Sequence, residues 1–167
     1  MPRRTPRAYT LIEMLIVVTI LGIAAAIVVP QMLRAGTLGV QAATRIVVAD
    51  ILFAQNEAAT RKTTRRVVFD VDNNSYQITD GDGQAVASTL QAGSNPVYEV
   101  SFEGDDRFQG VEILAADFNG APILEFDDLG SPTSPSGGSV DLRFDNRQYR
   151  VRIAPFTGRV SIEKISG

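Results

Sequence analysis

Charged residues at two places in this chain of 167 residues are candidates for ion pairing or for binding a charged ligand. The first is a single carboxylate, Glu13, the one charge in the apolar run from Leu11 to Val29. An ionisable side chain inside a membrane is costly unless it finds a cationic partner, so Glu13 predicts an ion pair. The second set is basic, lies near the C-terminus and could bind phosphate groups. It consists of Arg143, Arg147, Arg150, Arg152, Arg159 and Lys164.

The composition disfavours other chemistry. The chain has no histidine and no cysteine, which removes the commonest general base and the usual zinc ligands. Acids at Asp70 and Asp80 imitate the start of a calcium loop, but both stretches lack the Gly and Glu that an EF-hand needs at its sixth and twelfth positions. We interpret them as turn acids. We therefore predict no metal, no cofactor and no enzymatic activity; a membrane-tethered enzyme would require paired carboxylates in a cleft.

The apolar run is just long enough to cross a bilayer as a helix. Three arginines and no acid precede it, which favours a cytoplasmic N-terminus. Two alternatives stay open. One is a secretory signal peptide cut after the alanines at 24–26, although the run continues beyond them and Glu13 interrupts it. The other is a plain anchor in which Glu13 reaches back to the interface.

A second helical pattern follows the apolar run. Residues 40–58 carry apolar side chains at spacings of three and four, which predicts one buried stripe on a core helix covered by a sheet. The stripe consists of Val40, Ala43, Val47, Ile51, Ala54 and Ala58. The two patterns predict one long bent helix from about Leu11 to Thr60, with a kink at Pro30.

Beyond Arg61 the sequence changes to short β-like segments, and residues 72–74 form a predicted hairpin turn. The expected strands are 66–71, 75–79, 97–102, 111–114, 123–126, 140–144, 148–153 and 159–165. One long helix followed by an antiparallel meander is an α+β arrangement.

The stretch Arg7-Ala8-Tyr9-Thr10-Leu11-Ile12-Glu13, followed by the apolar run, resembles the class III signal of type IV pilins and type II secretion pseudopilins. In that family a prepilin peptidase cuts before the run, usually after Gly, and N-methylates the new terminal residue, usually Phe. The resemblance implies cleavage between Ala8 and Tyr9, N-methylation of Tyr9, an assembly role for Glu13 and a helix kink at Pro30.

That cleavage would give Glu13 a partner. It would create an amino group on Tyr9, four residues before Glu13 and on the same face of a helix. The partner could be the amino terminus of the same chain or that of a neighbouring subunit. In the second case the ion pair would set the axial register of a filament.

The stretches VVADILFAQNEAATRKTTRRVVFD and YRVRIAPFTGRVSI are similar to minor pseudopilins of the GspH/FimT type. The resemblance implies a pilin-like fold, in which a long bent N-terminal helix with a membrane-spanning first half packs on an antiparallel β-sheet domain. It divides the chain into a leader (1–8), a transmembrane and assembly helix (9–30), a helix continuation (31–62) and a β-rich domain (63–167).

The implied function is that of a structural minor pseudopilin of a type II secretion pseudopilus. Its partners would be other pseudopilins, the prepilin peptidase and the inner-membrane assembly platform. The chain would cross the inner membrane once, with its globular domain in the periplasm. An alternative is a minor pilin of a type IV pilus or DNA-uptake system, with DNA contacts through Arg150, Arg152 and Arg159. Gly158-Arg159-Val160-Ser161 lacks the second arginine of that subgroup's Gly-Arg-x-Arg motif, so binding of nucleic acid is not the favoured prediction.

Overall fold

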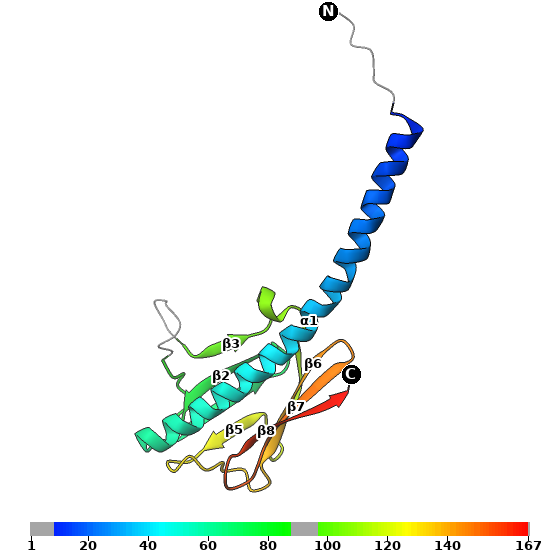
Figure 1. Ribbon diagram of the computed structural model, residues 1–167. Helices are drawn as coiled ribbons and strands as arrows, with labels where there is room; N and C mark the ends of the chain where they lie inside the picture. Colours follow the sequence, from blue (N-terminus) through cyan, green and yellow to red (C-terminus); the bar gives the residue numbers. More distant parts are fainter. Residues whose placement is uncertain (1–8, 88–96, 167) are drawn as a thin grey trace, which may run out of the picture. The chain divides into compact units, whose positions relative to one another are not determined.

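The computed structural model describes residues 9–87 and 97–166, without the side chains of residues 28–37 and of Asp106 (Figure 1). The chain divides into two compact units, Met1–Ala35 and Gly36–Gly167. One helix, α1 (Leu11–Arg61), contributes to both units. Its bounds agree with the predicted helix to within one residue.

Local hydrogen bonds explain where α1 begins and ends. The Thr10 hydroxyl accepts a hydrogen bond from the backbone N–H of Glu13 at 3.2 Å, the arrangement of an N-cap. Threonine followed three residues later by glutamate is also the capping-box pattern. At the other end, Lys62 has a φ of 55° and the N–H of Thr63 donates to the carbonyl of Ala58, which is a Schellman-type stop.

The predicted stripe of α1 is confirmed. All six of its side chains have no exposed surface. They belong to one core cluster with buried residues of the strands, among them Val67, Ile78, Leu142 and Val151. The second half of α1 is therefore the core helix of the globular unit.

All eight predicted strands are present, with shifts of one to three residues at most of their ends. They are β1 (Arg65–Asp70), β2 (Ser75–Asp80), β3 (Glu99–Ser101), β4 (Glu112–Asp117), β5 (Ile123–Phe126), β6 (Gly138–Phe144), β7 (Arg147–Ile153) and β8 (Val160–Ser166). A short 3₁₀ helix, η1 (Asp106–Phe108), precedes β4.

The strands form two antiparallel sheets of four strands, with the orders β3-β2-β1-β5 and β4-β6-β7-β8 (Figure 1). The expected antiparallel α+β class is confirmed, but the expected meander is wrong. β5 returns to pair with the edge of β1 that β2 leaves open, and β4 pairs with β6 in the other sheet. Each sheet buries one face, and both faces contribute to the core cluster that contains α1.

Candidate functional site

Residues 11–27 of α1 have an apolar surface on which nothing in the described part of the chain packs. Between residues 11 and 27 every side chain is exposed, and the exposed fraction of the large apolar ones runs from 47% for Val17 to 87% for Leu11. Residues 11–27 form an apolar helix of 17 residues. Residues 38–61 also meet the length and hydropathy of a membrane span, but 44% of that window is buried inside the domain, as in a core helix.

Most polar groups of this apolar helix are satisfied within it. The Thr19 hydroxyl donates to the carbonyl of Leu15 at 2.7 Å, which suits a side chain surrounded by lipid or by other helices. Thr10 caps the helix through the N–H of Glu13. The carboxylate of Glu13 is exposed, and within residues 9–27 it has no hydrogen-bond partner. Glu13 is thus the group of this helix that is available to an external cation.

The other residues of the predicted N-terminal signal lie around the helix start. Ala8 lies outside the described residues. Tyr9 precedes α1 and is 76% exposed, so in this uncut chain it does not share a helical face with Glu13. The shared face stays a prediction for the cleaved chain. Pro30 lies within α1, and its kink also stays a prediction.

In the globular unit, α1 has a second face that the sequence pattern did not single out. Exposed residues recur at spacings of three and four on the side opposite the buried stripe. Between residues 38 and 56 they are Leu38, Ala42, Arg45, Ala49, Leu52 and Asn56. Four of the six are apolar, so this face also offers a surface to neighbouring helices.

Carboxylates accompany two of the three arginines predicted to contact DNA. Arg150 on β7 makes two hydrogen bonds of 2.7 Å to the buried carboxylate of Asp141 on β6. These hydrogen bonds, with the negative charge, raise the pKa of Arg150. The guanidinium Nη2 of Arg152 lies 3.3 Å from the carboxylate Oε2 of Glu163 on β8. Neither pair follows from the sequence alone, because both depend on strand register, which brings Arg150 opposite Asp141.

Arg159 differs from those two arginines. It lies in the turn before β8, its side chain is exposed, and among the described residues no carboxylate pairs with it. A basic stripe of three free arginines is therefore not present on this sheet.

A buried carboxylate joins α1 to the first sheet. Asp50 accepts hydrogen bonds from the hydroxyls of Tyr76 at 2.5 Å and Tyr98 at 2.6 Å. Burial raises the pKa of Asp50, while the two hydroxyls act to lower it. Burial and the nearby Asp50 raise the pKa of both tyrosines. Local sequence patterns do not reveal this cluster, because its members lie far apart in the chain. Asp50 and Tyr76 are 26 residues apart, and Tyr76 and Tyr98 are 22 residues apart.

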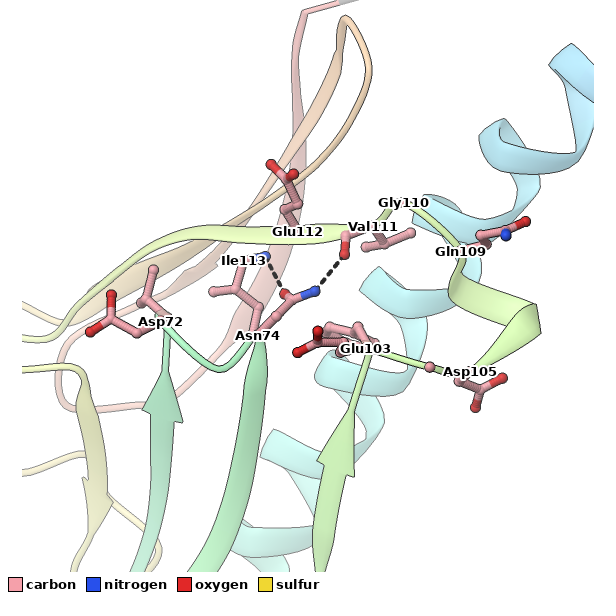
Figure 2. Close-up of a pocket in the computed structure, with 12 residues that line it drawn as sticks. Asp72, Asn74, Glu103, Asp105, Gln109, Gly110, Val111, Glu112 and Ile113 are labelled. Atoms are coloured by element: carbon pink, nitrogen blue, oxygen red, sulfur yellow. Dashed lines mark hydrogen bonds between the residues drawn. The ribbon is translucent and has the colours of Figure 1, made fainter.

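A pocket of about 550 Å³ lies between the β1–β2 turn and the segment before β4 (Figure 2). The Asn74 amide holds these two segments together: it donates to the Val111 carbonyl at 2.7 Å and accepts from the Ile113 N–H at 2.8 Å. Acids surround the pocket, but Asp105 pairs with Arg107 and Glu112 pairs with Arg143. Within the described residues no three metal-ligating side chains lie close enough together to hold a metal ion.

The predicted turn acids are confirmed as such. The Asp70 carboxylate accepts from the backbone N–H of Asn73, and the Asp80 carboxylate accepts from the N–H groups of Asp82 and Gln84. These are hydrogen bonds of Asx turns.

Family models match most of this chain. Residues 3–29 match the prokaryotic N-terminal methylation motif. Residues 43–158, more than half of the chain, match the type II transport protein GspH. The chain belongs to the GspH family. No curated protein matches it significantly. The matched motif and the apolar helix together indicate a membrane-anchored, pilin-like member of this family.

Solved structures confirm the pilin-like fold of this GspH-family chain. The type IV minor pilin FimU of Pseudomonas aeruginosa is 16% identical, with a TM-score of 0.53 over 74% of this chain and 87% of FimU. The minor pseudopilin EpsH of the Vibrio cholerae type 2 secretion system is 13% identical, with a TM-score of 0.52 over 76% of this chain and 96% of EpsH. At these identities the likeness concerns the fold.

Proposed function

We propose that this GspH-family chain is a structural, non-catalytic minor pseudopilin that assembles through its N-terminal helix into a type II secretion pseudopilus. One observation carries the proposal: among the described residues, nothing packs against the large apolar side chains of α1 between Leu11 and Ile27. Eleven large apolar side chains between Leu11 and Ile27 are about half exposed or more. Burying each stabilises by roughly 1.5–3 kcal/mol, so a membrane or a bundle of helices is favoured by on the order of 20 kcal/mol.

The proposed organisation follows from this helix. Residues 1–8 are the leader, 9–30 the membrane and assembly helix, 31–62 the helix continuation and 63–167 the β-rich domain. The arginines of the leader stay in the cytoplasm, the helix crosses the inner membrane and the domain lies in the periplasm. The prepilin peptidase and the inner-membrane assembly platform are the proposed partners before assembly, and other pseudopilins are the partners afterwards.

Glu13 gives the assembly its specificity. Cleavage after Ala8 would release a positively charged amino group on Tyr9, and the exposed carboxylate of Glu13 is the available partner in this helix. An unpaired carboxylate in a membrane is costly, up to roughly 2.5–3.5 kcal/mol at the centre on insertion scales, so pairing it with a neighbour's terminus favours the assembled state. The exposed face of α1 from Leu38 to Asn56 would then continue the contact between helices.

The test replaces Glu13 by Ala and by Gln in the full chain, with Thr19→Val as the matched control, since Thr19 is polar but already satisfied within the helix. We expect both Glu13 variants to insert into the membrane normally but to co-purify poorly with the other pseudopilins. The control should be recruited like the original chain. Normal recruitment of Glu13→Ala would refute the proposed role.

A minor pilin that contacts DNA is a second candidate, and Arg159, which is exposed and has no carboxylate partner in the described part of the chain, favours it. Its test is a gel shift of the detergent-solubilised full chain at several salt concentrations. If Arg159 contacts a phosphate, Arg159→Gln should weaken binding and reduce the salt slope by about one. A shift that is absent, or that does not depend on salt, would exclude this candidate.

A further inference from the structure

Two exposed apolar side chains lie on neighbouring turns of the globular unit. Leu129 is 68% exposed, in the turn that follows β5. Phe156 is 75% exposed, in the turn between β7 and β8. We name these two side chains the Leu129–Phe156 patch. Neither contributes to the core cluster, so their apolar character has no evident role in folding.

One side chain of α1 holds both turns. The Gln55 amide donates to the carbonyl of Gly130 at 2.8 Å and to the carbonyl of Thr157 at 3.2 Å. The Asp127 carboxylate also accepts from the N–H of Leu129 at 2.9 Å, and this bond fixes the first turn. The backbone of both turns is therefore held in place before any partner arrives, which lowers the backbone entropy lost on binding.

The backbone at Phe156 is strained. Its φ is 62°, and the N–H of Thr157 donates to the carbonyl of Pro155 at 2.7 Å across it. This is the positive-φ γ-turn, which is rare and unfavourable for a bulky side chain. Glycine would fit this position without strain. A strained, exposed aromatic residue points to a role outside folding.

We propose that the Leu129–Phe156 patch docks into the globular domain of a neighbouring pilin-like subunit. This inference rests on the proposed function, because it takes the partner from the same filament. A few side chains, with aromatic ones prominent among them, carry most of the binding energy of a protein interface. A bilayer surface fits less well, since Asp127 and Asp128 directly precede Leu129 and would repel anionic lipids.

This chain itself shows what a pilin-like domain offers to such an anchor. Val111 lines the pocket of Figure 2, and its side chain lies beside Gly39 of α1. Gln55, which holds the patch, is sixteen residues further along α1, or about 24 Å at 1.5 Å per residue. Patch and pocket thus belong to opposite ends of the domain helix. Stacked domains of this fold could join the patch of one to the pocket of the next, a head-to-tail contact that suits a filament.

The electrostatic character of the two ends is also compatible. Arg159 follows Phe156 by three residues, is exposed and has no carboxylate partner within residues 9–87 and 97–166. The pocket presents Asp72 and Glu103, for which the described part of the chain provides no ion pair. Such a pairing would add orientation more than affinity.

The first experiment places a benzophenone-bearing residue at position 156 of the full chain in cells in which its recruitment has been verified by co-purification. The control places it at Ile165, which is 45% exposed on β8. We expect position 156, and not position 165, to cross-link a pilin-like subunit identified by mass spectrometry. Adducts only with lipid or with a protein that is not pilin-like, equal yields at both positions, or no adduct would overturn the inference.

The second experiment separates docking from folding. Phe156→Gly should leave the melting temperature of the full chain in detergent unchanged or higher, because it relieves the positive φ. In the same variant, a benzophenone at position 129 should cross-link the pilin-like subunit at least about tenfold less, as expected when a hot-spot anchor is removed. A lower melting temperature, or an unchanged cross-link, would overturn the inference. The proposed function has its own independent test in the recruitment of Glu13→Ala.

Discussion

The two halves of α1 are parts of one continuous helix, but they are buried in opposite ways. From Leu11 to Ile27 no side chain is buried, whereas from Val40 to Ala58 a complete stripe has no exposed surface. Both stretches are rich in Ile, Val, Leu and Ala. The difference is that the second half packs on two sheets of its own domain, whereas the described side chains of residues 11–27 are exposed.

This difference shows how one element can serve both folding and assembly. The domain half has one face buried against the sheets and an exposed face opposite it, where Arg45 and Asn56 interrupt the apolar residues. The N-terminal half is apolar all round, as expected for a helix surrounded by lipid or by other helices. Substitutions in the two halves should therefore affect different measurements.

Matched truncations should give the largest contrast. Ile51→Ala removes a fully buried side chain and should lower the free energy of unfolding by about 2–5 kcal/mol. Ile20→Ala, at a position 60% exposed, should change it by less than about 0.5 kcal/mol. Denaturant unfolding of the full chain in detergent, followed by near-UV circular dichroism of its tyrosines, measures both. Equal losses in the free energy of unfolding for Ile51→Ala and Ile20→Ala would show that both halves of α1 contribute to folding.

The buried carboxylate should give the next largest effect. Tyr76→Phe removes a donor from Asp50 in a fully buried setting and should lower the free energy of unfolding by about 1–3 kcal/mol. Tyr98→Phe removes the equivalent donor at a half-buried position, where water can replace it, and should cost less. The same unfolding experiment decides. A larger loss for Tyr98→Phe would contradict this account of the cluster.

The pH dependence of Asp50 has a definite sign. Burial raises its pKa above the ordinary value of 3.8, so the folded state holds the proton more tightly than the unfolded state. The tighter binding of this proton adds to the free energy of unfolding. That contribution is fully present below pH 3.8 and is lost as the pH rises through the raised pKa of Asp50. Asp50→Asn cannot titrate, so the stability advantage of the original chain over this variant should shrink as the pH rises from 3.8. An advantage that grows over that range would show that the pKa is lowered instead.

The exposed face of the domain half should give the smallest effect on folding. Ala49→Gln should change the free energy of unfolding by less than about 0.5 kcal/mol, because Ala49 is exposed. Its co-purification with other pseudopilins should fall if this face continues the helix contact. Normal co-purification would restrict the assembly surface to the first half of α1.

Local patterns in the sequence were sufficient to predict the elements. The buried stripe of α1 repeats every three to four residues, and each strand is a short apolar or alternating run between turn residues, so period alone locates them. The Asp70 and Asp80 turns were also predictable, since an Asx turn is formed within four residues. The N-terminal motif is equally local, and the family model matches it directly.

Long-range pairing could not be predicted in the same way. The return of β5 to β1 joins strands more than fifty residues apart, and nothing in either strand specifies the partner. Asp141 neutralises Arg150 only in the observed register, and Asp50 meets two tyrosines only after α1 has packed on the first sheet. The strain at Phe156 is a backbone property that its neighbours in sequence do not reveal.

We propose that a cut between Ala8 and Tyr9 releases the apolar helix for assembly. The cut would also create the amino group on Tyr9 that pairs with Glu13. Intact-mass and N-terminal analysis of the protein extracted from membranes tests it most directly. We expect a mature chain that begins at N-methylated Tyr9. An uncut chain that begins at Met1, or one that begins after Ala26, would contradict it.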